Sequence, residues 1–316
     1  MLNLIRNEWM KLWSKKATWV MVVLIALLMI GSAGIFKWIK SPIGESPTDD
    51  WKIASQEQVK LLESQLTDPN LSKEELQDLK DSITVEKHRL EKDIAPITSE
   101  SVKGFINEIP GMLSVITLFT VVVAGGIVAS EFSQGTIKML LTRPVSRGKI
   151  LTSKLLTVGL YAVFMASISL LVGIIAAYIF FDSSPGTSLE VVNGKVVEVS
   201  FWVRLLLLMG LSLVNVLVIG MLAFMVGSVF RSSSLAIGIS IFLMFAGVNI
   251  TYMLAFKFEL AKYILFANTN LTQYIGNGQP LIDGMTMSFS IAVVSVYMLV
   301  FLVISYWSFI KRDVAA

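Results

Sequence analysis

Cysteine is absent from this 316-residue chain, and histidine occurs once, as His88. The absence of cysteine excludes disulfide bonds, thiolate metal ligands and thiol nucleophiles. With a single histidine, the chain cannot by itself build a His/Cys metal site. The charged neighbours of His88, at positions 86, 87 and 89, favour a solvated position on a helix surface. The sequence therefore predicts neither a catalytic site nor a metal site of these types.

The chain also lacks the glycine-rich loop G-x-x-x-x-G-K-[ST], which holds phosphate groups in many ATPases. Its two Gly-Lys pairs, at residues 148–149 and 194–195, have no earlier glycine at the required spacing and are followed by isoleucine and valine. We therefore expect the chain to bind no cofactor and to have no enzymatic activity of its own. Any nucleotide energy has to come from another polypeptide.

Charged residues are scarce, at 16% of the chain, whereas hydrophobic residues make up 54% and the mean hydropathy is +0.72. These values lie outside the range of ordinary soluble domains. A hydrocarbon core of about 30 Å requires roughly 20 apolar helical residues. Six runs of that length predict an all-α polytopic membrane protein with spans at residues 17–36, 110–130, 150–181, 201–230, 235–256 and 285–310.

Lysine and arginine near the span ends form four groups, and six spans place all four on one side of the membrane. The positive-inside rule makes that side the cytoplasm. We therefore predict a multi-pass protein of the cell membrane with both termini cytoplasmic, including a tail at 311–316. A cleaved signal peptide is the alternative for the first 36 residues, because 31–34 is rich in small residues. The four groups are Arg6, Lys11, Lys15 and Lys16; Lys138, Arg143, Arg147, Lys149 and Lys154; Arg231; and Lys311 and Arg312.

Residues 1–16 predict a basic amphipathic helix on the membrane surface. Its apolar residues recur at helical spacing, and two of them are tryptophans. A charged lead-in that only orients the first span is the alternative. The apolar residues are Leu2, Ile5, Trp9, Leu12 and Trp13.

Residues 37–109 are polar and charged, and they predict an extracytoplasmic helical hairpin. The first helix begins near Thr48 and stops at 67–70, and the second begins with the capping box at 72–75 and stops near Pro96. Its apolar residues are spaced for a coiled-coil-like seam, which could pack within the chain, on a second subunit or on a partner.

Two further external segments are expected. In residues 182–200, apolar and polar residues alternate around Asn193-Gly194, which is a strong signal for a two-residue β-hairpin. Residues 257–284 mix apolar residues with asparagines and are too short for another spanning pair. They predict short helices that dip into the outer leaflet.

The centres of the six spans carry almost no ionisable residue. Because ion-driven carriers normally need carboxylates at mid-depth, this scarcity argues against secondary transport. Asn215 and Asn249 are the clearest interior polar residues. They are candidates for a substrate path, although hydrogen bonding between helices is the commoner role of such residues.

Small residues recur at close-packing spacing in the second and fourth spans. Such spacing permits close helix approach, either within one chain or between two copies, and the sequence leaves both alternatives open. The residues are Gly125 with Ala129, Gly126 with Ser130, and Gly220 with Ala223 and Gly227.

Residues 131–149 form a polar, basic segment between the second and third spans. A short helix from Gly135 to Leu141 would end before Arg143-Pro144, because a residue that precedes proline disfavours helical geometry. Its apolar side, with Leu140, suits docking into a groove of a soluble partner. A solvated loop is the alternative.

At these residues the chain resembles a permease subunit of the ABC-2 class of ATP-binding cassette transporters. The resemblance rests on a long apolar helix running into Glu131, followed by Gly135-Thr136, Leu140-Leu141, the run 143–147 and Lys154. The basic N-terminal helix and the spacing of the six spans support it. The segment at 37–109 is longer than in the compact polysaccharide exporters of that class.

The resemblance implies a type V exporter-like fold with an N-terminal connecting helix, a cytoplasmic coupling helix and re-entrant external helices. It implies a second permease subunit, as a homodimer or heterodimer, and separate ATPase subunits that bind ATP and Mg²⁺. The substrate would be an exported amphiphile such as a peptide, an antibiotic or a lipid-linked molecule, and membrane lipid but not nucleic acid would be a partner. The residues expected to couple to the ATPase are Glu131, Gly135, Thr136, Leu140, Arg143, Pro144 and Arg147.

Two other functions remain open at this stage. The first is a gradient-driven secondary transporter, whose transport would stop when the ion gradient is lost but would survive ATP depletion. A membrane sensor or scaffold would act through the hairpin at 37–109.

Overall fold

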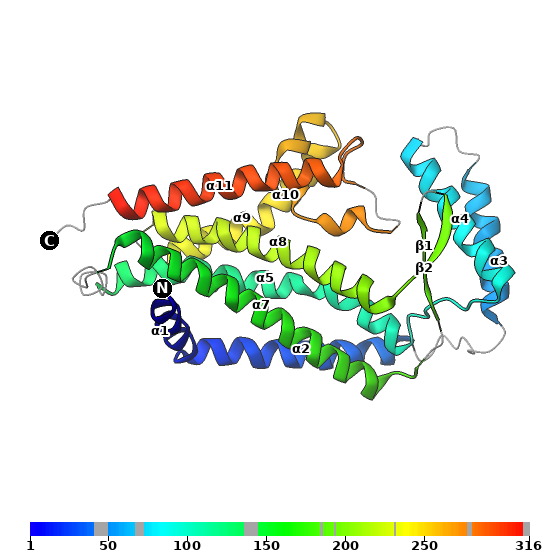
Figure 1. Ribbon diagram of the computed structural model, residues 1–316, viewed down its shortest axis with the longest axis horizontal. Helices are drawn as coiled ribbons and strands as arrows, with labels where there is room; N and C mark the ends of the chain where they lie inside the picture. The colour runs from blue at the N-terminus through cyan, green and yellow to red at the C-terminus, as the bar shows by residue number, and fades with distance from the viewer. Residues whose placement is uncertain are drawn as a thin grey trace.

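The computed structural model describes residues 1–40, 50–66, 73–135, 145–183, 186–192, 194–230, 232–276 and 280–311. It is an elongated helical bundle with a smaller module at one end (Figure 1). Within these described residues, six helices are long and apolar enough to span a membrane. They are α2 (Lys16–Lys40), α5 (Val102–Ser133), α7 (Arg147–Phe180), α8 (Phe201–Val229), α9 (Ser233–Ala255) and α11 (Met287–Lys311). The prediction of an all-α polytopic membrane protein with six long helices is confirmed.

Several helices extend beyond the predicted spans, most of all at the start of α5. Helix α5 begins at Val102 rather than at Pro110, because the Ser101 side chain caps it by accepting a hydrogen bond from the Gly104 backbone amide. The added turns are buried, so Pro110 lies inside the helix. Helix α7 begins at Arg147 rather than at Ile150. The region between the second and third spans is therefore shorter than expected.

Helix α5 lies at the centre of the bundle and packs against α7, α8 and α9. Its contact with α8 depends on glycine: a Cβ at Gly227 would lie 2.4 Å from the backbone oxygen of Gly125. A Cβ at Gly220 would lie 2.9 Å from the Thr120 side chain. These small residues serve packing within one chain, which decides the question that their spacing had left open.

The module at the far end of the bundle contains two helices and a β-hairpin, namely α3 (Asp50–Gln65), α4 (Lys73–Lys92), β1 (Ser188–Val192) and β2 (Lys195–Val199). Helix α3 packs against α4, so the predicted seam is used within the chain. Strands β1 and β2 pair antiparallel with Val192 opposite Lys195. Gly194 has a φ of +75°, which a two-residue turn of this kind requires.

Polar contacts fasten the module to the bundle. The buried Arg89 side chain donates hydrogen bonds to the backbone oxygens of Ala95 and Thr187, at 3.2 Å each. Lys103, in the first turn of α5, donates to the backbone oxygen of Gly186 at 2.8 Å. Arg89 therefore joins α4 to the segment that leads into β1, within the module, and Lys103 ties the module to α5.

The region expected at 257–284 contains the short helices η1 (Glu259–Tyr263), α10 (Leu265–Asn268) and η2 (Leu271–Tyr274), as predicted. Their anchor is the buried Asn268. Its amide nitrogen donates to the backbone oxygens of Lys262 and Ile264, and its oxygen accepts from the Ser290 hydroxyl of α11 at 2.7 Å. A satisfied buried amide of this kind fixes the segment against the last long helix.

Candidate functional site

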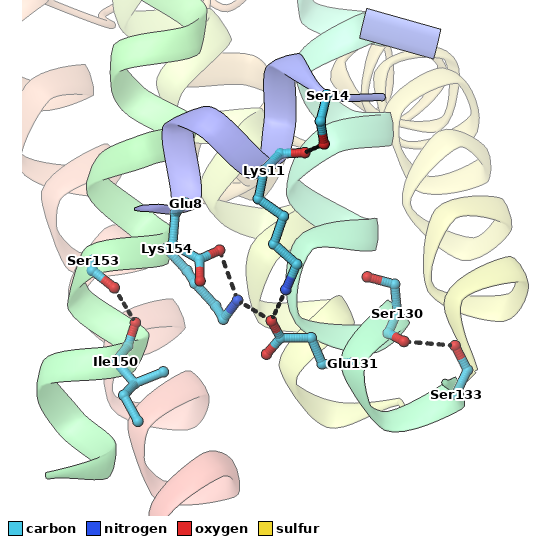
Figure 2. Close-up of polar contacts among 9 residues, drawn as sticks. All are labelled: Glu8, Lys11, Ser14, Ser130, Glu131, Ser133, Ile150, Ser153 and Lys154. Atoms are coloured by element: carbon cyan, nitrogen blue, oxygen red, sulfur yellow. Dashed lines mark hydrogen bonds and ion pairs between the residues drawn. The ribbon is translucent and has the colours of Figure 1, made fainter. Parts of the chain in front are cut away.

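Four charged side chains from three helices meet at the end of the bundle where α1 lies and α11 ends, and we call Glu8, Lys11, Glu131 and Lys154 the ionic cluster. Lys154 Nζ lies 2.8 Å from Glu8 Oε2 and 2.7 Å from Glu131 Oε1. Lys11 Nζ lies 2.5 Å from the same Glu131 oxygen. Figure 2 shows these side chains pointing toward one another. The cluster joins segments more than 100 residues apart.

The helical geometry of the sequence places each member. Glu8 and Lys11 are three residues apart on α1 (Leu2–Trp13), so they share a face. Glu131 lies in the last turn of α5, and Lys154 lies in the second turn of α7. The two inner charges therefore stand on the two helices that lead into and out of residues 136–144.

The corner between α1 and α2 is held by its own hydrogen bonds. The buried Thr18 hydroxyl donates to the Leu12 backbone oxygen at 2.7 Å, and the Trp19 indole donates to the Trp13 backbone oxygen at 3.1 Å. Because these bonds fix the turn, α1 crosses the direction of the long helices and presents Glu8 to the bundle (Figure 1).

Burial makes the cluster energetically demanding. The exposed fraction of the side chain is 0% for Lys154, 2% for Glu131 and 10% for Glu8, whereas it is 49% for Lys11. Charges removed from water are costly unless they are paired and hydrogen-bonded. Two carboxylates and two ammonium groups make the cluster formally neutral, which satisfies that requirement.

Lys15 lies close enough to the ionic cluster for the cluster's charges to affect its pKa. Desolvation lowers the pKa of Lys15 below its ordinary value, and the positive charges of Lys11 and Lys154 lower it further. Glu131 and Glu8 act in the opposite direction, but less strongly. At Lys15, the repulsion from the two lysines of the cluster therefore outweighs the attraction of its two carboxylates.

Aromatic rings surround the cluster on the side of α1. Trp13 contacts Trp9, Trp19 and Phe164 with ring centroids 5.6, 5.3 and 4.9 Å apart, respectively. Tryptophan is enriched where a membrane meets water. The three tryptophans therefore indicate that α1 lies at the level where the membrane meets water.

The residues expected to couple to an ATPase fall into two groups. Thr136, Leu140, Arg143 and Pro144 lie outside the described residues. Glu131, Gly135 and Arg147 are described, and they lie at the two edges of 136–144. Glu131 is buried in the ionic cluster, so it has no surface for direct contact with a soluble partner.

Gly135 and Arg147 have structural tasks at these edges. Gly135 has a φ of +69° immediately after α5, where it ends that helix, and the rest of the helix expected from Gly135 to Leu141 lies outside the described residues. The Arg147 guanidinium donates to the backbone oxygen of Ile310 at 3.1 Å. A cation on the terminal carbonyls of a helix is favourable, so Arg147 ties the start of α7 to the end of α11.

The two asparagines proposed for a substrate path lie on the neighbouring helices α8 and α9, and their role stays a prediction. Asn249 is exposed on α9 and donates to the Phe245 backbone oxygen of its own helix at 2.8 Å. This hydrogen bond of Asn249 is therefore within one helix rather than between two helices. Asn215 is half-buried on α8.

Sequence reasoning missed the cluster as a unit. It used Lys11 and Lys154 as topology signals, and Lys154 also as part of the resemblance, but it predicted no contact between Glu8, Glu131 and Lys154. A usable signal was present: Lys154 lies inside an apolar run, where an unpaired ammonium is costly. Glu8 is the one acidic residue among the first 16.

The chain is similar over its whole length to "Uncharacterized protein YhcI" of Bacillus subtilis (strain 168), with 39% identity over 320 residues that cover 100% of both chains. It is also similar to "Uncharacterized membrane protein YdbK" of that strain, with 31% identity over 218 residues, or 69% of this chain and 85% of that protein. Residues 88–315 match the family described as "Protein of unknown function (DUF2705)". Because the match covers well over half of the chain, the protein belongs to this family.

Proposed function

We propose that this chain is the membrane-spanning permease subunit of an ABC-2 type transporter, with a type V exporter-like architecture. The observation that carries the proposal is the ionic cluster, which ties α1 to the two helices on either side of 136–144. A partner that moves 136–144 would act on all three helices together. Such a link is what an external motor needs in order to drive a bundle.

The packing of α5 extends this link to the rest of the bundle. Helix α5 contacts α7, α8 and α9, and the approach between α5 and α8 leaves no room for a Cβ at Gly227. Close-packed interfaces change between discrete arrangements rather than deforming continuously. A displacement of Glu131 would therefore shift the long helices as a set.

In this proposal the chain itself is not an enzyme. ATP and Mg²⁺ are bound by separate ATPase subunits, and a second permease subunit completes the path. The exported substrate is an amphiphile such as a peptide, an antibiotic or a lipid-linked molecule, and nucleic acid is not a partner. Both termini and the ionic cluster face the cytoplasm of the cell, where the ATPase resides.

The first experiment is to tag the chain in its native membrane, extract it in mild detergent and identify what copurifies by mass spectrometry. We expect a soluble ATPase in stoichiometric amount, together with one or two kinds of permease chain. A folded, monodisperse chain that reproducibly lacks an ATPase would contradict the proposal.

A variant then tests the coupling segment. Replacing Arg143 and Pro144 by alanine should abolish transport while the complex still inserts and assembles, because the segment that meets the ATPase is altered. Lys149→Ala, at an exposed position of α7, is the control and should keep transport. Unchanged transport in the double variant would count against this role.

A gradient-driven carrier is the second candidate, because Glu8 and Glu131 supply the buried carboxylates that proton transfer uses. The cluster lies at the end of the bundle rather than at mid-depth, which is why we favour the ATP-driven function (Figure 1). Transport that stops with an uncoupler but survives ATP depletion would reverse this preference. A sensor acting through α3 and α4 would instead lose its response when these helices are deleted.

A further inference from the structure

A groove runs between α1 and α7 on the outside of the bundle. Its volume is about 700 Å³, within the range of roughly 300–1,000 Å³ that is usual for sites that hold small organic ligands. The walls are mainly apolar and come from both helices, with Leu2, Ile5 and Trp9 on α1 and Leu160, Val163 and Phe164 on α7.

One cation lines this apolar groove. Arg6 stands among the lining residues and is exposed. Among the residues that the structure describes, no carboxylate forms an ion pair with Arg6, whereas Lys11 and Lys154 are both paired in the ionic cluster. The groove therefore combines an apolar wall with an uncompensated positive charge. Its chemical complement is a molecule with a hydrocarbon chain and an anionic group.

The depth of the groove agrees with such an occupant. Trp9, Trp13 and Trp19 lie at this end of the long helices, and tryptophan rings favour the level of lipid headgroups. Leu160 and Val163 lie further along α7, toward the middle of the spanning helix. An acyl chain along α7 would leave its headgroup beside Arg6.

We infer that this groove is a binding site for one anionic phospholipid. An acyl chain packs over the touching rings of Trp9 and Phe164, whose centroids lie 5.8 Å apart, and the phosphate oxygens accept hydrogen bonds from the Arg6 guanidinium, whose planar donors match a phosphate. The lipid fills the open side of the contact between α1 and α7 and so supports the helix that carries Glu8. This inference does not depend on the proposed transport activity.

The test uses the full chain in nanodiscs of phosphatidylcholine that contain a trace of photoreactive lipid. The reactive group sits on the acyl chain, and the headgroup is either phosphatidylglycerol or phosphatidylcholine. After illumination, the labelled peptides are identified by mass spectrometry. We expect phosphatidylglycerol to label the groove peptides about fivefold more than phosphatidylcholine does, as the attraction between one arginine and an anionic lipid predicts.

Two variants locate the site. Arg6→Gln should reduce the labelling by phosphatidylglycerol about fivefold, to the level of phosphatidylcholine. Lys149→Gln removes one positive charge outside the groove and should leave the preference intact. Ser167→Phe, at a lining residue exposed on the outside of α7, should reduce labelling by both lipids because the ring fills the groove.

Equal labelling by the two lipids in the unaltered protein would overturn the inference and leave only ordinary surrounding lipid. A preference that survives Arg6→Gln would also overturn it, as would labels that map outside α1 and α7. Each variant is first checked for monodispersity, so a misfolded protein is not counted as a loss of binding. The measurement needs no ATPase, so its failure is separate from a failure of the proposed function.

Discussion

A lysine with no exposed surface is the most demanding residue of this chain. The Lys154 nitrogen lies within 2.8 Å of carboxylate oxygens of both Glu8 and Glu131. A buried ion pair adds little net stability over apolar residues of the same size, but removal of one partner is expensive. The cluster is therefore better understood as a device that fixes where α1 docks.

The residue-scale prediction concerns this lysine. Lys154→Met keeps the length of the side chain but leaves buried carboxylates without their main cation. We expect the free energy of unfolding to fall by about 3–5 kcal/mol, measured by chemical unfolding in mixed micelles. Lys149→Met, on the exposed side of the same helix, should change it by less than about 0.5 kcal/mol.

A double-mutant cycle separates the pair from the rest of the cluster. The double variant Glu131→Gln with Lys154→Met should be more stable than the sum of the two single losses predicts, by about 0.5–3 kcal/mol. If the two losses simply add, the 2.7 Å contact between these side chains carries no coupling and the description of the cluster as one unit fails.

At the scale of the elements, the contact between α5 and α8 is set by the absence of side chains. Gly227 faces the backbone of Gly125, where a Cβ would approach the carbonyl oxygen to 2.4 Å. On the same helix α8, Gly210 has no atom within 4 Å of a built Cβ and is exposed. A side chain can therefore be added at Gly210 but not at Gly227, although both glycines stand on α8.

Gly227→Ala should push α5 and α8 apart and reduce the free energy of unfolding by about 1–3 kcal/mol, the usual range for overpacking. Gly210→Ala should instead be neutral or stabilise the protein by up to about 1 kcal/mol, because alanine favours helix. Thermal unfolding of the two variants in the same detergent makes the comparison. Equal effects would contradict the close contact.

For the whole molecule, the arrangement of charge separates the two ends of the bundle. The ionic cluster, α1 and the end of α11 lie at one end, and the module of α3, α4 and the β-hairpin lies at the other (Figure 1). The positive-inside rule, applied to the short segments between the spans, predicts that the first end faces the cytoplasm. The absence of cysteine makes this orientation simple to measure.

Single cysteines placed at the two ends should react differently with a membrane-impermeant thiol reagent. Ser64→Cys on α3 should be labelled in intact cells, whereas Ser146→Cys, just before α7, should be labelled only after the membrane is permeabilised. Both serines are exposed, so access through the membrane decides the result. The unaltered protein is the blank. The reverse pattern would invert the topology and remove the cytoplasmic face from the proposed function.

The sequence alone determined the six spanning helices, because runs of about 20 apolar residues have few alternatives in a membrane. It also determined the hairpin turn at Gly194, where a local backbone conformation requires glycine. These features depend on neighbouring residues or on length.

Only the tertiary structure decided which distant residues meet. Glu8, Glu131 and Lys154 stand on three helices, and each looks like an ordinary end-of-helix charge until the helices are packed. The burial of Phe105 and Ile106 in the first turns of α5 likewise depends on packing against other elements, which local propensity does not encode. A buried charge needs a partner of opposite charge. The spacing of residues within one segment does not show which distant residue that partner is, because the pairing depends on how the helices pack.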